Sequence, residues 1–202
     1  MKNILDVLFV RDKHVCPWWC CFTFDNPIRR LFHDPIRILS PYVRPGNTAI
    51  DIGPGMGFFT VAMCDLVGPN GKVIAIDVQE RMLKGLSQRV SRHNLADRLM
   101  THLASPEEFG VTSRADFILA FWMVHEVPDQ KHFLEEVAGL LKPTGAFLMV
   151  EPRMHVTGKA FDKTLGAAGD AGLRVEASPR IAFSMSALFC RENTATANIA
   201  AV

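Results

Sequence analysis

The stretch that most constrains the fold of this chain is TAIDIGPGMGFFTVAM, residues 48–63. It begins with a short, mostly apolar run of the kind that forms a strand buried on both faces. Gly53, Gly55 and Gly57 follow at alternate positions, and the amphipathic segment after them predicts a helix over residues 57–67. A strand, a tight glycine turn and a helix N-terminus place unpaired backbone N–H groups at the carboxyl edge of a sheet. The stretch therefore predicts a ligand site at that edge.

The glycine spacing and two carboxylates narrow the kind of ligand. The dinucleotide fingerprint is GxGxxG, whereas this chain has GxGxG with Asp51 two residues before Gly53. A carboxylate at this position suits a cationic ligand better than a pyrophosphate, which it would repel. A phosphate-binding P-loop is excluded because no GK[ST] follows. The next apolar run, residues 72–76, ends in Asp77, whose carboxylate can accept hydrogen bonds from both hydroxyls of a ribose.

The motif DIGPGMG, followed by an acidic residue that ends the second strand, resembles the cofactor site of class I S-adenosylmethionine-dependent methyltransferases. The resemblance extends over residues 48–192. It implies an enzyme with S-adenosylmethionine as cofactor, its methionine end on the glycine turn and its ribose on Asp77. The predicted cofactor residues are Asp51, Gly53, Gly55, Gly57, Phe59, Asp77, Val78, Met82, Ala104, Ser105 and Phe121.

Ser105 follows the third predicted strand, where many relatives place a polar residue against the adenine amino group. Its alternative role is to cap the turn SPEE, residues 105–108. The two roles are compatible, because a cap at this position lies at the same edge of the sheet.

Strand and helix patterns alternate from residue 48 onward. Strands are predicted at residues 48–52, 72–76, 98–103, 116–121, 145–150, 173–178 and 183–190, and helices at residues 57–67, 79–92, 130–141 and 158–171. Such alternation indicates a parallel sheet with right-handed crossovers. The last two strands are too close for a crossover and must pair as a hairpin, so the final strand is antiparallel. The predicted fold is α/β: a Rossmann-like three-layer sandwich around a seven-stranded, mostly parallel sheet.

The chain is predicted to form one structural domain with three regions. Residues 1–47 form a helical cap or lid, residues 48–192 the S-adenosylmethionine-binding domain, and residues 193–202 a tail. Asn26-Pro27 and Asp34-Pro35 each read as an N-cap followed by proline at the first helical position. Two short helices follow from this pattern. Their predicted inward side chains are Ile28, Leu31 and Phe32 on the first helix, and Ile36, Ile38 and Leu39 on the second.

The segment AFWMVHE, residues 120–126, bears on the methyl acceptor. It lacks the Asn/Asp-Pro-Pro-aromatic motif of relatives that methylate base amino groups, and it resembles the small-molecule branch of the family. Trp122 is predicted to contact the substrate, and His125 to act as general base for a hydroxyl, amine or thiol. The alternatives are ordinary core packing for the aromatic residues and a structural hydrogen bond for the histidine.

The cluster HVCPWWCCFTF, residues 14–24, lies within a predicted substrate lid, residues 14–33. Its predicted substrate contacts are Cys16, Trp18, Trp19, Cys20 and Phe24. Three interpretations stay open. The cluster is buried core, or it binds a metal, although a second ligand pair at zinc-site spacing is missing. In the third, it faces a soft acceptor such as a thiol or a trivalent arsenic species. No metal ligand is assigned.

Bulk properties limit the partners of the chain. A formal charge of +1 over 202 residues gives no electrostatic footprint for nucleic acid. No apolar run reaches the length needed to span a bilayer. Five cysteines, an odd number without a regular framework, favour a reduced, cytoplasmic location. The expected partner is a small-molecule acceptor, with no nucleic acid and no membrane.

The sequence predicts S-adenosylmethionine-dependent methyl transfer to a small molecule, with a thiol or other soft nucleophile among the acceptors. The alternative from another class is a non-catalytic, S-adenosylmethionine-binding regulatory protein. A nicotinamide-dependent oxidoreductase is disfavoured by the glycine spacing.

Overall fold

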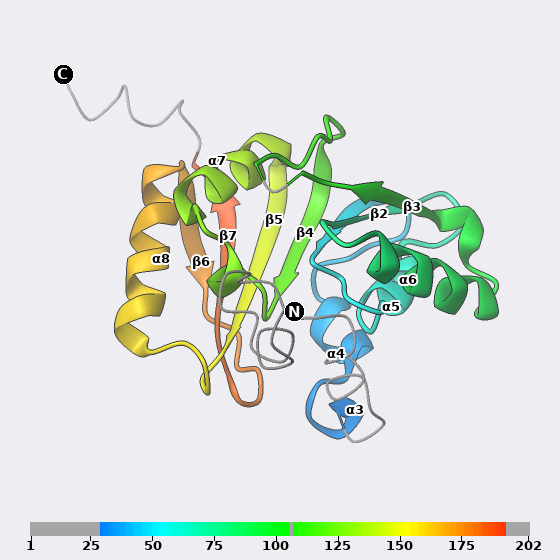
Figure 1. The fold of residues 1–202 in the computed structure, drawn as a ribbon, viewed down its shortest axis with the longest axis horizontal. Helices are drawn as coiled ribbons and strands as arrows, with labels where there is room; N and C mark the ends of the chain where they lie inside the picture. Colours follow the sequence, from blue (N-terminus) through cyan, green and yellow to red (C-terminus); the bar gives the residue numbers. More distant parts are fainter. Residues whose placement is uncertain (1–28, 106, 193–202) are drawn as a thin grey trace, which may run out of the picture.

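The structure, a computed structural model, describes residues 29–105 and 107–192. Within these residues seven strands form one sheet in the order β3-β2-β1-β4-β5-β7-β6 (Figure 1). The strands are β1 (Thr48–Ile52), β2 (Lys72–Asp77), β3 (Leu99–Leu103), β4 (Ala115–Phe121), β5 (Leu141–Pro152), β6 (Leu173–Ala177) and β7 (Ser184–Arg191).

The strand directions confirm the predicted mixed sheet. β1 pairs in parallel with β2 and β4, and the parallel set continues through β3 on one side and β5 on the other. β7 is antiparallel to both β5 and β6. The chain between β6 and β7 is too short for a crossover, so β7 returns beside β6 and fills the place between β6 and β5.

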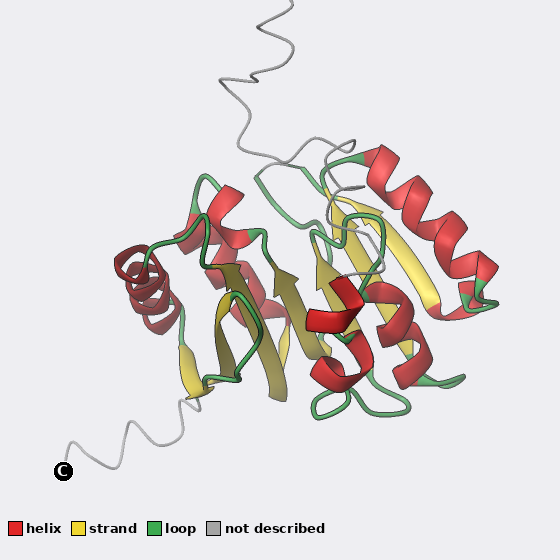
Figure 2. Ribbon diagram, turned by 90° about the horizontal axis from the view of Figure 1, so that it is seen from below, coloured by secondary structure: helices red, strands yellow, loops and turns green. Residues whose placement is uncertain are grey.

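Helices cover both faces of the sheet and make the three predicted layers (Figure 2). The helices on one face are α4 (Pro35–Leu39), α5 (Thr60–Val67) and α6 (Glu80–Arg92), and those on the other are α7 (Gln130–Leu140) and α8 (Gly158–Asp170). Side chains along each strand point alternately to the two faces of the sheet, so each strand contributes to both hydrophobic cores. Ile50 and Ile118 pack with α7 and α8, whereas Ala49 and Phe117 pack with α4, α5 and α6.

The helix after the glycine turn begins later than the sequence predicted. It was expected over residues 57–67, but α5 begins at Thr60. Gly57 has a φ of +84°, which a right-handed helix does not allow, so the helix starts only beyond it. A Cβ on Gly57 would lie 3.1 Å from Cγ of Leu86 in α6. Gly57 therefore lets the turn pack closely against α6.

The short N-terminal helices depart from the prediction in which side chains they bury. Asp34 caps α4 as expected, with Oδ1 accepting hydrogen bonds from the amides of the second and third residues after it. Leu39 is fully buried, but Ile36 is 42% exposed, so its predicted inward position is wrong. In α3 (Arg29–Phe32), Leu31 is 80% and Phe32 51% exposed, so theirs are wrong too. One helical turn has no defined face, and α3 turns Arg29 toward the protein instead. Ile28 and the Asn26-Pro27 pair lie outside the described residues.

Candidate active site

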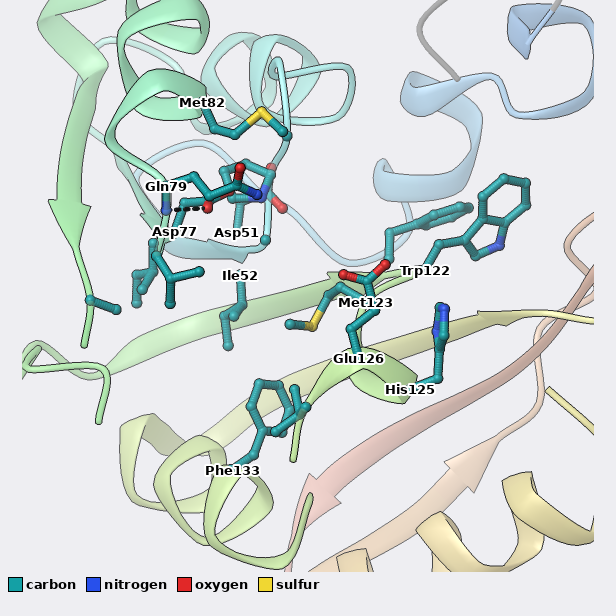
Figure 3. Close-up of a pocket in the computed structure, with 18 of the residues that line it drawn as sticks. Asp51, Ile52, Asp77, Gln79, Met82, Trp122, Met123, His125, Glu126 and Phe133 are labelled. Carbon is teal, nitrogen blue, oxygen red and sulfur yellow. Dashed lines mark hydrogen bonds between the residues drawn. The ribbon is translucent and has the colours of Figure 1, made fainter. Parts of the chain in front are cut away.

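A cavity of about 1050 Å³ lies at the carboxyl ends of the central parallel strands (Figure 3). It is lined by nearly all the predicted cofactor residues that the sequence singled out: Asp51, Gly53, Gly55, Phe59, Asp77, Val78, Met82, Ala104, Ser105 and Phe121. Trp122 and His125 line it as well, and in Figure 3 they lie on the side away from Asp77. The volume is enough for a nucleoside cofactor and a second small molecule.

One predicted cofactor residue, Gly57, does not line the cavity. Gly57 faces α6, so a direct contact of Gly57 with the cofactor stays a prediction. The five predicted substrate residues of the N-terminal cluster lie outside the described residues, and their roles also stay predictions. They are Cys16, Trp18, Trp19, Cys20 and Phe24.

The glycine turn presents backbone to the cavity. Gly53 and Gly55 have φ values of +63° and +54°, in the left-handed region where a Cβ is disfavoured. A Cβ on Gly53 would lie 3.0 Å from Cγ of Met123, so a larger residue would push on the opposite wall. α5 follows directly, and its N-cap residue, Phe59, makes no side-chain cap. The helix N-terminus therefore has no side-chain cap, and the Val61 amide donates to the carbonyl oxygen of Gly57 at 3.2 Å.

Asp77 ends β2 and is 8% exposed. The backbone N–H of Gln79 donates to its Oδ1 at 2.8 Å, and the amides of Val78 and Gly55 also donate to the carboxylate. Burial raises the pKa of Asp77 to about 6; these hydrogen bonds act in the opposite direction and the charge of Glu126 in the same one. The carboxylate is held by the glycine turn with acceptor capacity to spare, as a ribose site requires.

Ser105 lies at the same edge of the sheet and is exposed. Its Oγ accepts hydrogen bonds from the amides of Glu107 at 3.2 Å and Glu108 at 3.1 Å, so the capping role is present. Because Ser105 also lines the cavity, contact with an adenine stays a prediction beside the cap.

Asp51 is the more deeply buried of the two carboxylates, at 2% exposed. Thr60 Oγ1 donates to its Oδ2 at 2.6 Å. Burial raises the pKa of Asp51 to about 7; the Thr60 hydrogen bond lowers it and the nearby charge of Asp77 raises it. A positive group arriving in the cavity would favour the ionised carboxylate.

This burial predicts that the ligand-free protein loses stability as the pH rises. The pKa of Asp51 moves from an ordinary 3.8 to about 7 on folding, so the folded state binds the proton more tightly. Its contribution to stability is fully present below about pH 4 and is lost as the pH rises toward 7. Asp51→Asn should therefore melt at a higher temperature than the wild type at pH 8, with a flatter dependence between pH 5 and 8. Asp65→Asn, at an exposed position of α5, should keep the wild-type slope; an unchanged slope in both variants would contradict the assignment.

His125 and Glu151 form a hydrogen-bonded pair at the other side of the cavity. Nδ1 of His125 lies 2.7 Å from Oε2 of Glu151, which is 2% exposed. The carboxylate also accepts the backbone amides of Val124 at 3.0 Å and His125 at 3.1 Å, which fixes η3 (Val124–Glu126). Burial lowers the pKa of His125, but the hydrogen bond and charge of Glu151, with the charge of Glu126, raise it above its ordinary value overall. Such a pair is suited to accept a proton at Nε2.

Aromatic residues and a second histidine surround this side of the cavity. The ring of Phe121 lies 4.2 Å from that of Phe59 and 5.6 Å from that of Trp122, centroid to centroid. His33, 2% exposed, stands edge-on to both Phe121 and Trp122. Nε2 of His33 lies 2.7 Å from the Ala182 carbonyl oxygen, so it carries the proton, and burial lowers the pKa of this histidine. His33 is therefore a neutral part of the wall.

The sequence interpretation did not single out Glu151, His33 or Arg29, all of which line or support the cavity, although His33 and Arg29 fall within the predicted lid, residues 14–33. The sequence could have indicated Glu151 as a site residue, because it is an acidic residue at the carboxyl end of the apolar run AFLMV, residues 146–150. No such indication exists for Arg29 and His33, because their place depends on how the N-terminal helices pack.

Within residues 29–105 and 107–192 no group of three or more His, Cys, Asp or Glu side chains could hold a metal ion. No helix in the same residues is long and apolar enough to cross a membrane.

Comparison with known proteins identifies the family. Residues 44–179 match the family model described as a methyltransferase domain. The chain belongs to the class I S-adenosylmethionine-dependent methyltransferases. S-adenosylmethionine is the cofactor that this family and fold imply, and the glycine turn, the buried Asp77 and the apolar side chains of Val78 and Met82 in the cavity lining fit that cofactor.

The similar proteins differ in how much of this chain they match. Over 109 residues it is 30% identical to the demethylmenaquinone methyltransferase of Bacillus cereus (strain ATCC 10987 / NRS 248), a match covering 54% of this chain and 46% of the relative. The chain thus spans about half the length of the curated relatives it matches. A SAM-dependent methyltransferase from Aquifex aeolicus superposes with a TM-score of 0.77 at 24% identity, covering 87% of this chain and 98% of that one. The [4+2]-cyclase SpnF superposes with a TM-score of 0.65 at 12% identity, covering 78% and 80%. At these identities the two structural likenesses are likenesses of fold.

Proposed function

We propose that this methyltransferase moves the methyl group of S-adenosylmethionine to a small-molecule acceptor and that His125 removes the acceptor's proton. The observation that carries the proposal is the His125–Glu151 pair, which faces the same cavity as the candidate cofactor residues. A histidine oriented by a buried carboxylate supports transfer over binding alone, because such a histidine is suited to act as a general base.

When bound, S-adenosylmethionine supplies an electrophilic methyl group on a sulfonium. Glu151 holds Nδ1–H of His125, which leaves the Nε2 lone pair to accept the proton from an acceptor O–H, N–H or S–H. The acceptor would take the methyl group as the S–CH3 bond of the sulfonium breaks, with the electron pair of that bond staying on sulfur, and Glu151 would stabilise the imidazolium formed on His125. The rings of Phe59, Phe121 and Trp122 exclude water from a reaction in which opposite charges are neutralised.

The lining near His125 supports an apolar, polarizable acceptor. Met123, Trp122, Met154 and Phe183 line the cavity there, and thioether and aromatic groups suit soft or aromatic ligands. A thiol or another soft nucleophile fits this lining. A phenol or a quinol fits it also, and the relatives named for demethylmenaquinone support that class. Incubation with methyl-labelled S-adenosylmethionine and a thiol, a phenol or a quinol should label at least one acceptor. Cofactor binding without transfer to any of the three would favour the non-catalytic alternative.

The predicted cap and location belong to the same proposal. Arg29, Phe32 and His33 line the cavity, which supports a cap formed by residues 1–47 with a lid at residues 14–33. Cys64 and Cys190 are both free thiols, in keeping with the cytoplasmic location proposed from the odd number of cysteines.

Asp77 provides the test of cofactor binding. The wild type should bind S-adenosylhomocysteine, and Asp77→Ala should weaken that binding at least about tenfold, because a charge-assisted hydrogen bond to ribose is lost. Isothermal titration calorimetry measures both affinities. Asp97→Ala, at an exposed position, should bind as the wild type does. Tight binding of NADH together with no binding of S-adenosylhomocysteine would overturn the cofactor assignment.

A further inference from the structure

Large apolar side chains at the mouth of the cavity face the solvent. Phe32, Met154 and Phe183 line the cavity, yet each of them is more than half exposed. A side chain that both lines a cavity and is exposed lies at its rim. Leu31, the neighbour of Phe32 on α3, is exposed as well. A cluster of exposed apolar side chains is typical of a surface that meets another molecule.

The rim is built from three segments that lie far apart in the sequence. The rings of Phe32 and Phe183 meet edge to face, with their centroids 5.2 Å apart. The amide of Arg153 donates to the carbonyl oxygen of Phe183 at 3.0 Å, and its Nε donates to that of Ser184, also at 3.0 Å. α3, the end of β5 and the turn before β7 therefore form one continuous rim, at the lower edge of the molecule in Figure 1.

The same three segments are strongly basic. Residues 29–37, 153–159 and 178–183 together hold six arginines and lysines and one aspartate, a formal charge of +5, whereas the whole chain carries +1. The exposed basic residues of these segments are Arg30, Arg37, Arg153, Lys159 and Arg180. The ion pairs found among the described residues involve other side chains. The rim therefore combines apolar side chains with an excess of positive charge.

Exposed carboxylates of the cavity lining lie away from this rim. Glu107 and Glu108 follow β3, which is the edge strand at the opposite end of the sheet from β7 and β6. Asp129 caps α7, on the other face of the sheet from α4. An extended anionic surface would thus be attracted to the side of the mouth formed by α3, β5 and the turn before β7.

We propose that this rim docks on an anionic lipid bilayer. Phe32, Met154 and Phe183 enter the headgroup region, and the surrounding arginines contact lipid phosphates, so that apolar burial and charge both favour binding. A second copy of the chain is a less suitable partner, because in a symmetric dimer this positive surface would meet itself. Nucleic acid is less suitable too, because the exposed side chains of Leu31 and Met154 offer no aromatic face on which a base could stack.

Docking turns the mouth of the cavity toward the bilayer. The apolar acceptor of the proposed function would then enter from lipid rather than from water. Only this consequence rests on the proposed function, since docking requires neither cofactor nor acceptor. The sequence led us to expect no membrane partner because no apolar run is long enough to span a bilayer. A surface that lies on a bilayer needs no such run.

Co-sedimentation of the full chain with lipid vesicles tests the charge. The wild type should bind vesicles of phosphatidylcholine and phosphatidylglycerol about tenfold or more tightly than vesicles of phosphatidylcholine alone, and high salt should weaken this binding several-fold. Arg30→Gln/Arg180→Gln should bind the anionic vesicles about tenfold more weakly. The matched control, Lys84→Gln/Arg92→Gln, removes the same charge from exposed positions of α6, which packs on β2 and β3, and should bind as the wild type does.

A second pair of variants tests the apolar side chains. Met154→Ser/Phe183→Ser should bind the anionic vesicles about tenfold or more weakly, because two side chains that enter the bilayer are lost. Met100→Ser/Leu103→Ser, at exposed positions of β3, serves as the control and should bind as the wild type does. Circular dichroism checks the fold. If Met154→Ser/Phe183→Ser is unfolded, Met154→Ser alone replaces it, with a several-fold loss expected.

The outcomes separate docking from methyl transfer. Equal binding of the wild type to both kinds of vesicle, or wild-type binding by both sets of rim variants, would overturn the proposal. Absence of vesicle binding would overturn it too. In that case, loss of self-association or of RNA binding in the rim variants would identify a second copy or a nucleic acid as the partner. The full chain is used, so a rim covered by residues 1–28 would also show as absent binding. Methyl transfer to a water-soluble acceptor is measured without vesicles, so the proposed function stands or falls separately.

Discussion

Gly55→Val is expected to weaken S-adenosylhomocysteine binding at least about a hundredfold while the protein remains folded. Gly55 lines the cavity at a φ of +54° and donates its amide to Asp77. Valine is β-branched and strongly disfavours this backbone conformation, so the turn must shift where it lines the cavity. Both the backbone surface and the position of Asp77 that we propose for the cofactor are then altered. Calorimetric titration gives the affinity, and circular dichroism the fold.

A substitution at a second glycine serves as the control for the effect of backbone strain alone. Gly172, between α8 and β6, has a φ of +78°, and a Cβ there would meet no atom within 4 Å. Gly172→Val should therefore cost stability of the same order, roughly 1–3 kcal/mol, and bind S-adenosylhomocysteine as the wild type does. Unchanged affinity in folded Gly55→Val would show that the glycine turn does not touch the cofactor.

Loss of His125 should have the second large effect, on methyl transfer rather than on binding. His125→Ala should slow transfer to an acceptor that must lose a proton by about 10²–10⁴-fold, the range for a positioned general base. The affinity for S-adenosylhomocysteine should change little. His93→Ala, at an exposed position after α6, should transfer at the wild-type rate. A rate in His125→Ala within twofold of the wild type would sink the general-base role.

The pH dependence supplies an independent readout. His125 accepts a proton only in its neutral form, so kcat/KM should fall as the pH drops below its pKa, which Glu151 and Glu126 raise despite burial. Glu151→Gln removes a negative charge, so the acid limb of the profile should move to lower pH while the plateau rate falls. A profile that keeps its wild-type midpoint in Glu151→Gln would show that another group titrates.

Much of the lining on the candidate cofactor side of the cavity could be predicted, because its sequence signals are local. The turn glycines, Gly53 and Gly55, and the acidic end of β2 are each defined by a few consecutive residues. The His125–Glu151 pair depends instead on the register of two strands. Phe121 of β4 pairs with Val150 of β5, so Glu151 stands beside the turn that carries His125. Propensity and spacing do not specify such a register; packing of the whole sheet does.

The short N-terminal helices show a different limit. Apolar residues in a four- or five-residue helix do not define an inward face, because one turn points side chains in all directions. Leu31 and Ile36 were expected inside and are exposed, while Arg29 was assigned no role and lies among aromatic rings drawn from two other segments of the chain. The fold that the chain shares with the [4+2]-cyclase SpnF has a related limit as a guide to function. A shared sheet does not fix the reaction, which depends on particular side chains.

The two sides of the cavity are formed by different parts of the sequence. The candidate ribose and methionine contacts come from β1, β2 and their following turns, whereas Trp122, Met154 and Phe183 come from the ends of β4 and β5 and the approach to β7. Met154 and Phe183 are 87% and 58% exposed, so changes there carry little folding penalty. During evolution, mutations at Met154 and Phe183 could therefore change which acceptor the proposed reaction uses. The candidate ribose and methionine contacts would stay the same.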